Sequence, residues 1–276
     1  MKKVTLLSRL LAEGWFEEEK EARIWAMERK ILVDNVPVTS VSEKVKPDSE
    51  IRVKEYYKKK YVSKGGLKLE GALKDFQLDV SGITALDCGA STGGFTDCLV
   101  VHGAARVYAV DVGFGQIAGK LQSCPQVVNM ERTNLSDPLL KSLDPKPSLI
   151  TLDLSYLSLK KALPLCREIL APQGRVVALI KPLFEVESAE IRRTGIIDDP
   201  AVFQEILFDL CRHFDSEGLS ILGLTYSPIR GNTDTVEYFI ALSFEALAGQ
   251  TALNQSYPEY IGQIVEASMK IGKFKK

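Results

Sequence analysis

The chain has 276 residues, of which 45% are hydrophobic and 26% are charged, and its formal net charge is −1. This balance is typical of a soluble globular protein, and the length allows a small domain followed by a larger one. No apolar run approaches the roughly 18 residues of a membrane-spanning helix, and charged residues follow the N-terminus too closely for a signal peptide. We therefore expect a cytoplasmic protein without stable membrane association.

The cysteines and histidines argue against two kinds of site. The five cysteines form no Cys-x-x-Cys pair and lie mostly in apolar stretches, which favours buried free thiols over disulfides. His102 and His213 are the chain's two histidines, so a histidine-rich metal site is disfavoured. We expect no metal ion.

Residues 1–55 are expected to form a small α+β domain. Apolar residues recur at helical spacing over 6–11 and again over 22–26, which predicts two short helices. The stretch 31–38 then predicts two short strands around an Asp34-Asn35 turn, and 45–53 predicts a further turn and strand. A unit of this size buries little core of its own.

A basic stretch follows, and we expect it to be a linker over residues 56–68. Between Lys44 and Lys68 there are nine basic and three acidic residues, which give this window a charge of +6. Such a stripe is either a solvated linker or a contact surface for an anionic polymer. Tyrosines beside the lysines are able to stack on bases, which favours a nucleic acid. The side chains expected to contact RNA are Lys58, Lys59, Lys60 and Lys64.

From residue 69 to about 250, strand-like and helix-like segments alternate, which predicts an α/β domain with a doubly wound, mostly parallel sheet. The expected strands cover 83–88, 106–110, 127–130, 148–153 and 175–180, with helices that include 94–101 and 159–170. Two later apolar runs, 219–226 and 236–242, are too close for a crossover helix, so these strands should be antiparallel. This is the arrangement of Rossmann-like methyltransferases. Residues 251–276 are expected to form a tail with a terminal helix.

A loop with three glycines follows the first strand of this larger domain. Gly89, Gly93 and Gly94 allow a tight turn that brings a ligand close to a helix N-terminus. Asp111 ends the next strand, 22 positions after Gly89, and an acid at this distance is able to hold ribose hydroxyls. The alternative is a simple strand-to-helix turn. The loop residues expected to bind a cofactor are Gly89, Ala90, Ser91, Gly93, Gly94 and Phe95.

The pattern of this loop narrows the choice of cofactor. It lacks the middle glycine that a dinucleotide pyrophosphate requires, and it lacks the Gly-Lys-Ser/Thr ending of a P-loop. S-adenosylmethionine has a ribose and no phosphate and fits better. Asp87 is expected either to orient the loop or to approach the methionyl amine. Asn134 is expected to meet the adenine, or alternatively to form a turn or helix cap.

Four charged residues at the edges of apolar runs are the candidates for catalysis. They are Lys68, Asp153, Lys181 and Glu237. Charges at strand ends in an α/β protein face the crevice where ligands bind. Burial and a second lysine lower the pKa of a lysine, whereas carboxylates raise it and fix the ammonium. We expect Lys181 to act as a base or to steer a hydroxyl, with Lys68 beside it and the carboxylates orienting the pair. Singly, each is also explained as a member of a surface salt bridge.

Seven segments carry motifs across nearly the whole chain. They cover residues 61–69, 87–97, 107–116, 131–134, 153–159, 180–185 and 227–239. Together they resemble the FtsJ-type ribose 2'-O-methyltransferases, and more closely the TlyA (hemolysin A) family of ribosomal RNA methyltransferases. The resemblance implies a catalytic tetrad of Lys68, Asp153, Lys181 and Glu237. It also implies that the loop from Gly89 to Gly94 binds S-adenosylmethionine, with Asp111 on the ribose. We expect Asp153 to contact the cofactor as well.

The resemblance also implies a substrate and a partner. It implies methylation of cytidine 2'-hydroxyls in ribosomal RNA or ribosomal subunits, with a small RNA-binding domain at the N-terminus. That domain usually has a Ser-Arg pair, a glycine before its hairpin and an Asn-Gly turn, whereas this chain has Glu19-Lys20, Arg29-Lys30 and Asp34-Asn35 near those places. Two other readings stay open: a non-catalytic RNA-binding ribosome-assembly factor and a membrane-active hemolysin.

Overall fold

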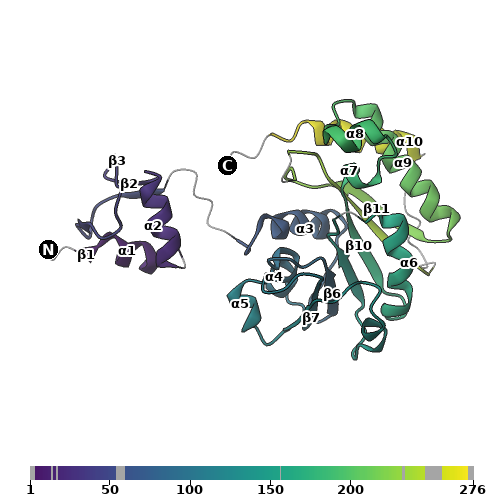
Figure 1. Cartoon of the computed structure of the whole chain (residues 1–276), viewed down its shortest axis with the longest axis horizontal. Coiled ribbons are helices and arrows are strands. Elements are labelled where there is room, and N and C mark those ends of the chain that lie inside the picture. The colour runs from purple at the N-terminus through teal and green to yellow at the C-terminus, as the bar shows by residue number, and fades with distance from the viewer. Residues whose placement is uncertain are drawn as a thin grey trace. The chain divides into compact units, whose positions relative to one another are not determined.

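The computed structural model describes residues 4–13, 15–16, 18–53, 60–155, 157–231, 234–245 and 257–272. The chain divides into two compact units, one that ends at Lys60 and one that begins at Tyr61. Figure 1 shows the two units with their helices and strands labelled. Each unit has a hydrophobic core of its own.

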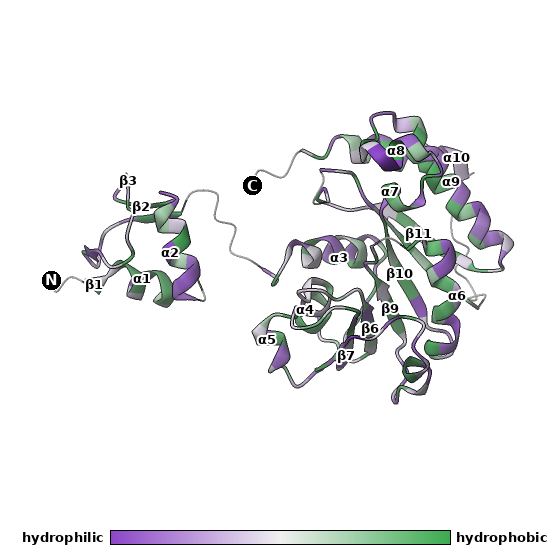
Figure 2. Cartoon of the chain, viewed as in Figure 1, coloured by the Kyte–Doolittle hydropathy of each residue, from purple (hydrophilic) through white to green (hydrophobic). Residues whose placement is uncertain are grey.

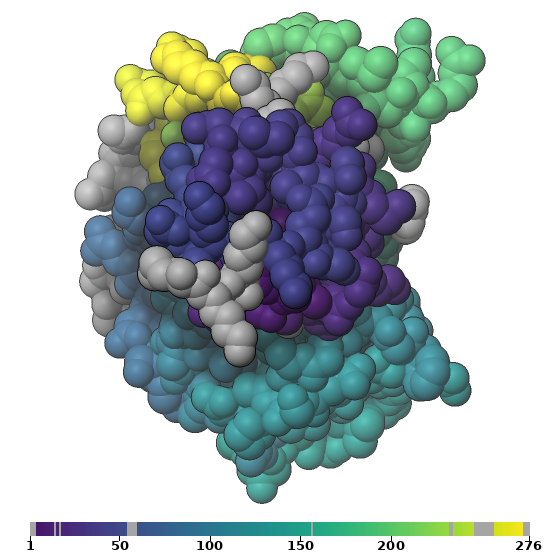
Figure 3. Space-filling model, turned by 90° about the vertical axis from the view of Figure 1, so that its left-hand side faces the viewer, coloured from purple at the N-terminus to yellow at the C-terminus, as the bar shows by residue number. Residues whose placement is uncertain are grey.

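The N-terminal unit contains two helices and two small sheets. Helices α1 (Leu6–Ala12) and α2 (Glu19–Met27) are followed by a three-stranded antiparallel sheet in the order β3-β2-β5. The strands of this sheet are β2 (Ile31–Val33), β3 (Val36–Pro37) and β5 (Ile51–Val53), while β1 (Val4–Thr5) pairs with β4 (Lys44–Val45). Asp34 and Asn35 both have positive φ angles, 50° and 66°, as a tight hairpin turn requires. In the space-filling view this unit is a closely packed body of purple and blue atoms (Figure 3).

The C-terminal unit is built on a seven-stranded sheet in the order β11-β12-β10-β9-β6-β7-β8. Its strands are β6 (Thr84–Cys88), β7 (Arg106–Asp111), β8 (Val127–Glu131), β9 (Leu149–Leu152), β10 (Arg175–Ile180), β11 (Ser220–Tyr226) and β12 (Tyr238–Ser243). Only β12 runs against its neighbours, because it pairs antiparallel with both β10 and β11. The predicted mostly parallel sheet with an antiparallel strand last in the chain is thus confirmed.

Helices cover both faces of this sheet (Figure 1). One face carries α3 (Lys64–Asp75) and α4 (Gly94–Val101), and the other carries α6 (Leu159–Ile169), α9 (Pro200–Ser216) and α10 (Tyr257–Met269). Shorter helices are α5 (Gly119–Gln122), a 3-10 turn at Pro138–Ser142, α7 (Pro182–Glu185) and α8 (Ala189–Thr194). The sheet strands are hydrophobic along most of their length, as the green ribbons of Figure 2 show.

Alternate residues of the central strand β10 pack into the two hydrophobic layers, one on each face of the sheet. In β10, Val176 and Ala178 pack under α6 and α9, whereas Val177 and Leu179 pack under α3 and α4. This follows from the strand geometry, in which successive side chains point to opposite faces. A strand buried on both faces is therefore apolar at every position, and such a run is what the sequence shows.

Helix α3 begins inside the stretch that the sequence analysis assigned to a linker. Residues 64–68 are helical and belong to the C-terminal unit. Gly65 and Gly66 in its first turn have a low intrinsic helix propensity, and packing explains Gly66. A Cβ at Gly66 would clash with the ring of Tyr61, which is 3% exposed, so only a glycine allows this approach. Of the expected RNA contacts, Lys60 and Lys64 are exposed, while Lys58 and Lys59 lie outside the described residues.

Candidate active site

Lys68 and Glu237 form a buried ion pair between α3 and the residue before β12. Lys68 Nζ lies 2.5 Å from Glu237 Oε2, and the two residues are 9% and 7% exposed. Burial raises the pKa of the Glu237 carboxyl, and the ammonium of Lys68 opposes this effect. The pair joins residues 169 positions apart and holds α3 to the end of the sheet.

Lys181 and Asp153 form a second ion pair at the carboxyl ends of β10 and β9. Lys181 Nζ lies 2.6 Å from Asp153 Oδ1 and donates to Ser155 Oγ at 3.3 Å. Strands β9 and β10 are parallel neighbours, so the residues that follow them emerge at the same edge. With side chains 19% and 24% exposed, this pair is more accessible than the first.

The two ion pairs lie close enough to influence each other. The pKa of the Glu237 carboxyl is raised first by burial and also by Asp153, while Lys68 and Lys181 lower it. The structure therefore brings together all four charges that the sequence singled out. Each lysine contacts a carboxylate of its own, Lys68 that of Glu237 and Lys181 that of Asp153.

The glycine loop lies directly against the segment that carries Asp153. Gly89 has a φ of 85°, and a Cβ there would clash with the carbonyl oxygen of Asp153. The backbone N–H of Asp153 donates to the carbonyl of Cys88 at 3.0 Å. From β6 the chain builds β7 and β8 on one side and β9 and β10 on the other. This is the switch point at which open α/β sheets bind ligands.

Asp111 is held by one backbone amide of the glycine loop and by one of the segment that follows β7. Ser91 N–H donates to Asp111 Oδ2 at 2.8 Å, and Gly113 N–H donates to Asp111 Oδ1 at 2.6 Å. A carboxylate has about four lone-pair positions, so this half-buried group keeps capacity for the hydroxyls of a ribose. A tight glycine turn with an oriented acid at the end of the next strand fits a nucleoside cofactor.

Two further residues of the predicted cofactor site, Asp87 and Phe95, are buried in the protein itself. Asp87 is fully buried and accepts hydrogen bonds from Thr96 and Thr151 at 2.7 and 3.0 Å, and burial raises its pKa to about 7. This geometry favours orientation of the loop over contact with the methionyl amine. Phe95 is 3% exposed and packs on Phe239, with ring centroids 6.0 Å apart, so its ring belongs to the core.

The remaining predicted residues are Asn134, which follows β8, and the loop residues Ala90 and Ser91. Asn134 is exposed, and its Oδ1 accepts from the N–H and the hydroxyl of Ser136, both at 3.0 Å, which is the turn that the sequence analysis kept as the alternative. Ala90 is 6% exposed and packs beside β7 and α5. Ser91 is exposed and has a φ of 49°, so the loop turns through a left-handed residue that is not a glycine.

Glu185 ends the 180–185 motif, and its position in the sequence predicts no role for it. Glu185 lies four positions after Lys181 and accepts hydrogen bonds from Ser158 Oγ at 2.6 Å and Leu159 N–H at 2.8 Å. It thereby caps α6, the helix that follows Asp153. An acidic residue directly after Lys-Pro-Leu-Phe could have marked Glu185 as a candidate. Its partner Leu159, 26 positions earlier, is visible only in the fold.

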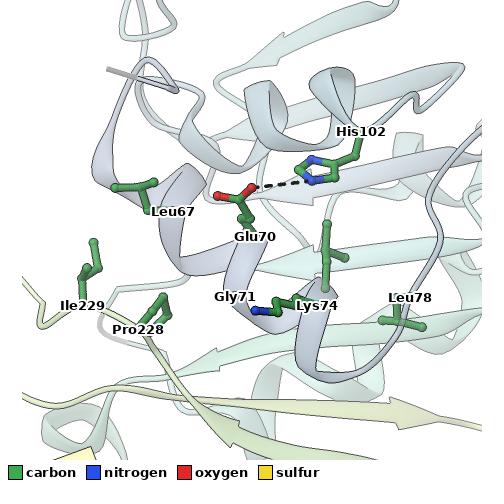
Figure 4. Close-up of a pocket in the computed structure, with 9 residues that line it drawn as sticks. Leu67, Glu70, Gly71, Lys74, Leu78, His102, Pro228 and Ile229 are labelled. Carbon is green, nitrogen blue, oxygen red and sulfur yellow. Dashed lines mark ion pairs between the residues drawn. The ribbon is translucent and has the colours of Figure 1, made fainter. Parts of the chain in front are cut away.

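A hollow of the C-terminal unit lies elsewhere on α3. It measures about 620 Å³ and is lined by Leu67, Glu70, Gly71, Leu73, Lys74, Leu78, His102, Pro228 and Ile229. Figure 4 shows Glu70 facing His102, whose Nε2 lies 3.9 Å from Glu70 Oε1. The hollow includes neither the glycine loop nor any of the four charges, so we place the cofactor at the switch point instead.

Fold and site together define a methyltransferase that uses S-adenosylmethionine. Residues 61–244 match the family of FtsJ-like methyltransferases. The candidate rRNA methyltransferase YqxC of Bacillus subtilis is 36% identical over 97% of this chain and 94% of its own length. The 16S/23S rRNA (cytidine-2'-O)-methyltransferase TlyA of Mycobacterium tuberculosis is 35% identical over 77% of this chain and 80% of its own.

A solved structure agrees with these relatives. The structure of a candidate hemolysin from Streptococcus thermophilus is 33% identical in sequence and superposes with a TM-score of 0.71. The match covers 98% of this chain and 97% of the hemolysin chain. The chain belongs to the FtsJ-like methyltransferases and, within them, to the TlyA (hemolysin A) family.

Proposed function

We propose that this protein transfers a methyl group from S-adenosylmethionine to the 2'-hydroxyl of a cytidine ribose in ribosomal RNA. The observation that carries the proposal is the Lys181–Asp153 ion pair, because it lies at the switch point against the glycine loop. The names of the relatives support ribosomal RNA as the substrate and cytidine as the nucleotide. A cytoplasmic location and ribosomal RNA or subunits as the partner belong to the same proposal.

The bound cofactor supplies an electrophilic methyl group on a positively charged sulfur. The protein has to place a hydroxyl oxygen in line with that methyl and to accept the hydroxyl proton. Lys181 Nζ, which lies 2.6 Å from Asp153 Oδ1 and donates to Ser155 Oγ, is a hydrogen-bond donor at the edge of the sheet, which suits steering of the oxygen. Its Ser155 contact at 3.3 Å holds the ammonium from a second side.

The other residues position these groups. Asp153 is an acceptor next to Lys181 and borders the glycine loop, so it is placed to receive the proton or to orient the ammonium. The Lys68–Glu237 pair lies close enough to Asp153 and Lys181 to interact with them electrostatically. Gly89 and Asp111 would hold the nucleoside part of the cofactor.

The test is transfer of a radiolabelled methyl group to ribosomal RNA by the purified protein. We expect labelled RNA in which the linkage after the modified nucleotide resists alkali. A 2'-O-methyl group has this effect because it blocks the hydroxyl that would attack the phosphate. Binding of cofactor and RNA without any transfer would instead identify an assembly factor. Lysis of liposomes without transfer would identify a hemolysin, although no helix in the described part of the chain is long and apolar enough to cross a membrane.

A further inference from the structure

The segment that carries Glu237 is joined to the C-terminal helix α10 on both sides of that residue. Before it, Arg230 Nε donates to the carbonyl oxygen of Ile271 at 3.0 Å, two residues beyond the end of α10. After it, the hydroxyls of Tyr238 and Ser268 lie 3.0 Å apart, and both residues are fully buried. Since Ser268 Oγ donates to the carbonyl of Val265, the Tyr238 hydroxyl is the donor to Ser268.

Arg230 also closes the turn that leads to Glu237. Its Nη1 donates to the carbonyl of Asp234 at 3.0 Å, and Gly231 N–H donates to the carbonyl of Thr235 at 2.9 Å. Gly231 lies so close to Glu237 that a Cβ would stand 2.5 Å from Oε1 of the carboxylate. The backbone that Arg230 fixes is therefore in contact with the carboxylate that pairs with Lys68.

Helix α10 is fixed to the C-terminal unit by buried side chains and by a hydrogen bond. Ile261 and Val265 are at most 1% exposed and belong to the core layer under α9. Tyr260 hydrogen-bonds to the carbonyl of Leu224 in β11 at 2.9 Å, which docks the helix without touching the Glu237 segment. A connecting segment is usually more mobile than the elements it joins, so its placement depends on such anchors.

We propose that α10 is a positioning element of the active site, in which Arg230 and Ser268 hold Glu237 against Lys68. These two are positioning residues, because they act through Glu237 and its backbone. The catalytic consequence rests on the proposed function, whereas the anchoring itself does not. The experiment therefore has one arm for each.

The first arm measures hydrogen–deuterium exchange of the backbone amides over residues 227–238. Arg230→Gln removes two side-chain hydrogen bonds and Ser268→Ala removes the acceptor of the Tyr238 hydroxyl, so each should speed exchange there about five- to tenfold. Tyr260→Phe is the matched control, because it removes a hydrogen bond of the same helix to β11. Equal exchange in all three variants would overturn the anchoring, whether or not the protein methylates RNA.

The second arm measures single-turnover methyl transfer with the same variants. Arg230→Gln and Ser268→Ala should lower the rate about tenfold with cofactor affinity and KM for RNA unchanged, while Tyr260→Phe stays at the wild-type rate. In a Glu237→Gln background, Arg230→Gln should add little further loss, because both act through one carboxylate. A fully additive loss would overturn the positioning role, and partial rescue by Arg230→Lys would support it. No transfer by the wild type would refute the proposed function and leave the exchange result to decide the anchoring.

Discussion

Replacing Lys68 by methionine should leave the carboxylate of Glu237 buried without its counter-ion. Glu237 is 7% exposed, and burial raises the pKa of its carboxyl while Lys68 lowers it. Removing one partner of a buried ion pair destabilises a protein by roughly 3–5 kcal/mol. Methionine fills most of the space of the lysine stem, so we expect the loss in the free energy of unfolding to arise from the charge. It should be in this range near pH 8.

The loss should shrink as the pH falls, because Glu237 then takes up a proton. Without Lys68 its folded-state pKa lies further above the unfolded value of about 4.3. For an acid whose folded pKa is raised, stability is fully present below the unfolded pKa and is lost as the pH rises through the folded one. Lys68→Met should therefore be close to wild-type stability near pH 5 and least stable near pH 8.

Calorimetry is the assay for this prediction, since both tryptophans, Trp15 and Trp25, lie in the N-terminal unit and their fluorescence does not report on this core. For a unit of this size, 3–5 kcal/mol corresponds to a fall in Tm of roughly 6–20 °C. The tryptophan signal should stay unchanged and serves as an internal control. The double variant Lys68→Met/Glu237→Gln should recover most of the loss. A Tm shift that is the same at pH 5 and pH 8, or no recovery in the double variant, would refute the reasoning.

Three further predictions concern the chemistry and its ligands. Lys181→Ala should lower kcat by about 10²-fold or more with cofactor affinity near wild type; normal turnover would exclude both the base and the steering role. Asp111→Ala should weaken cofactor binding about tenfold or more, measured by calorimetry, and unchanged affinity would remove it from the site. Neutralising Lys58, Lys59 and Lys60 should flatten the salt dependence of RNA binding, and a constant slope would leave the stripe a mere linker.

The sheet was predictable because its central strands are buried on both faces. Residues 176–180 form an uninterrupted apolar run, and the predicted strand 175–180 has the same bounds in the structure. The antiparallel direction of β12 was predictable from the short segment between the two strands, because the residues between Tyr226 and Tyr238 are too few for a crossover helix. Helix α3 was not, because Gly65 and Gly66 make its first turn look like a loop, and the packing of Tyr61 against Gly66 is visible only in the fold.

The site was predictable in its residues but not in its pairing. Charges after apolar runs pointed to Asp153 and Lys181, yet nothing in the sequence says that each lysine takes a separate carboxylate. The cap that Glu185 places on α6 depends on the approach of two loops, which local patterns do not encode. Phe95 looked like part of the glycine loop, but its position on the inner face of α4 places the ring in the core.

Nucleoside mass spectrometry of ribosomal RNA incubated with the purified protein and S-adenosylmethionine tests the proposed reaction directly. We expect 2'-O-methylcytidine to be formed by the wild-type protein and to be absent when the Lys181→Ala variant replaces it. Methylation found on a base instead of a ribose, or 2'-O-methylcytidine formed equally by both proteins, would contradict it.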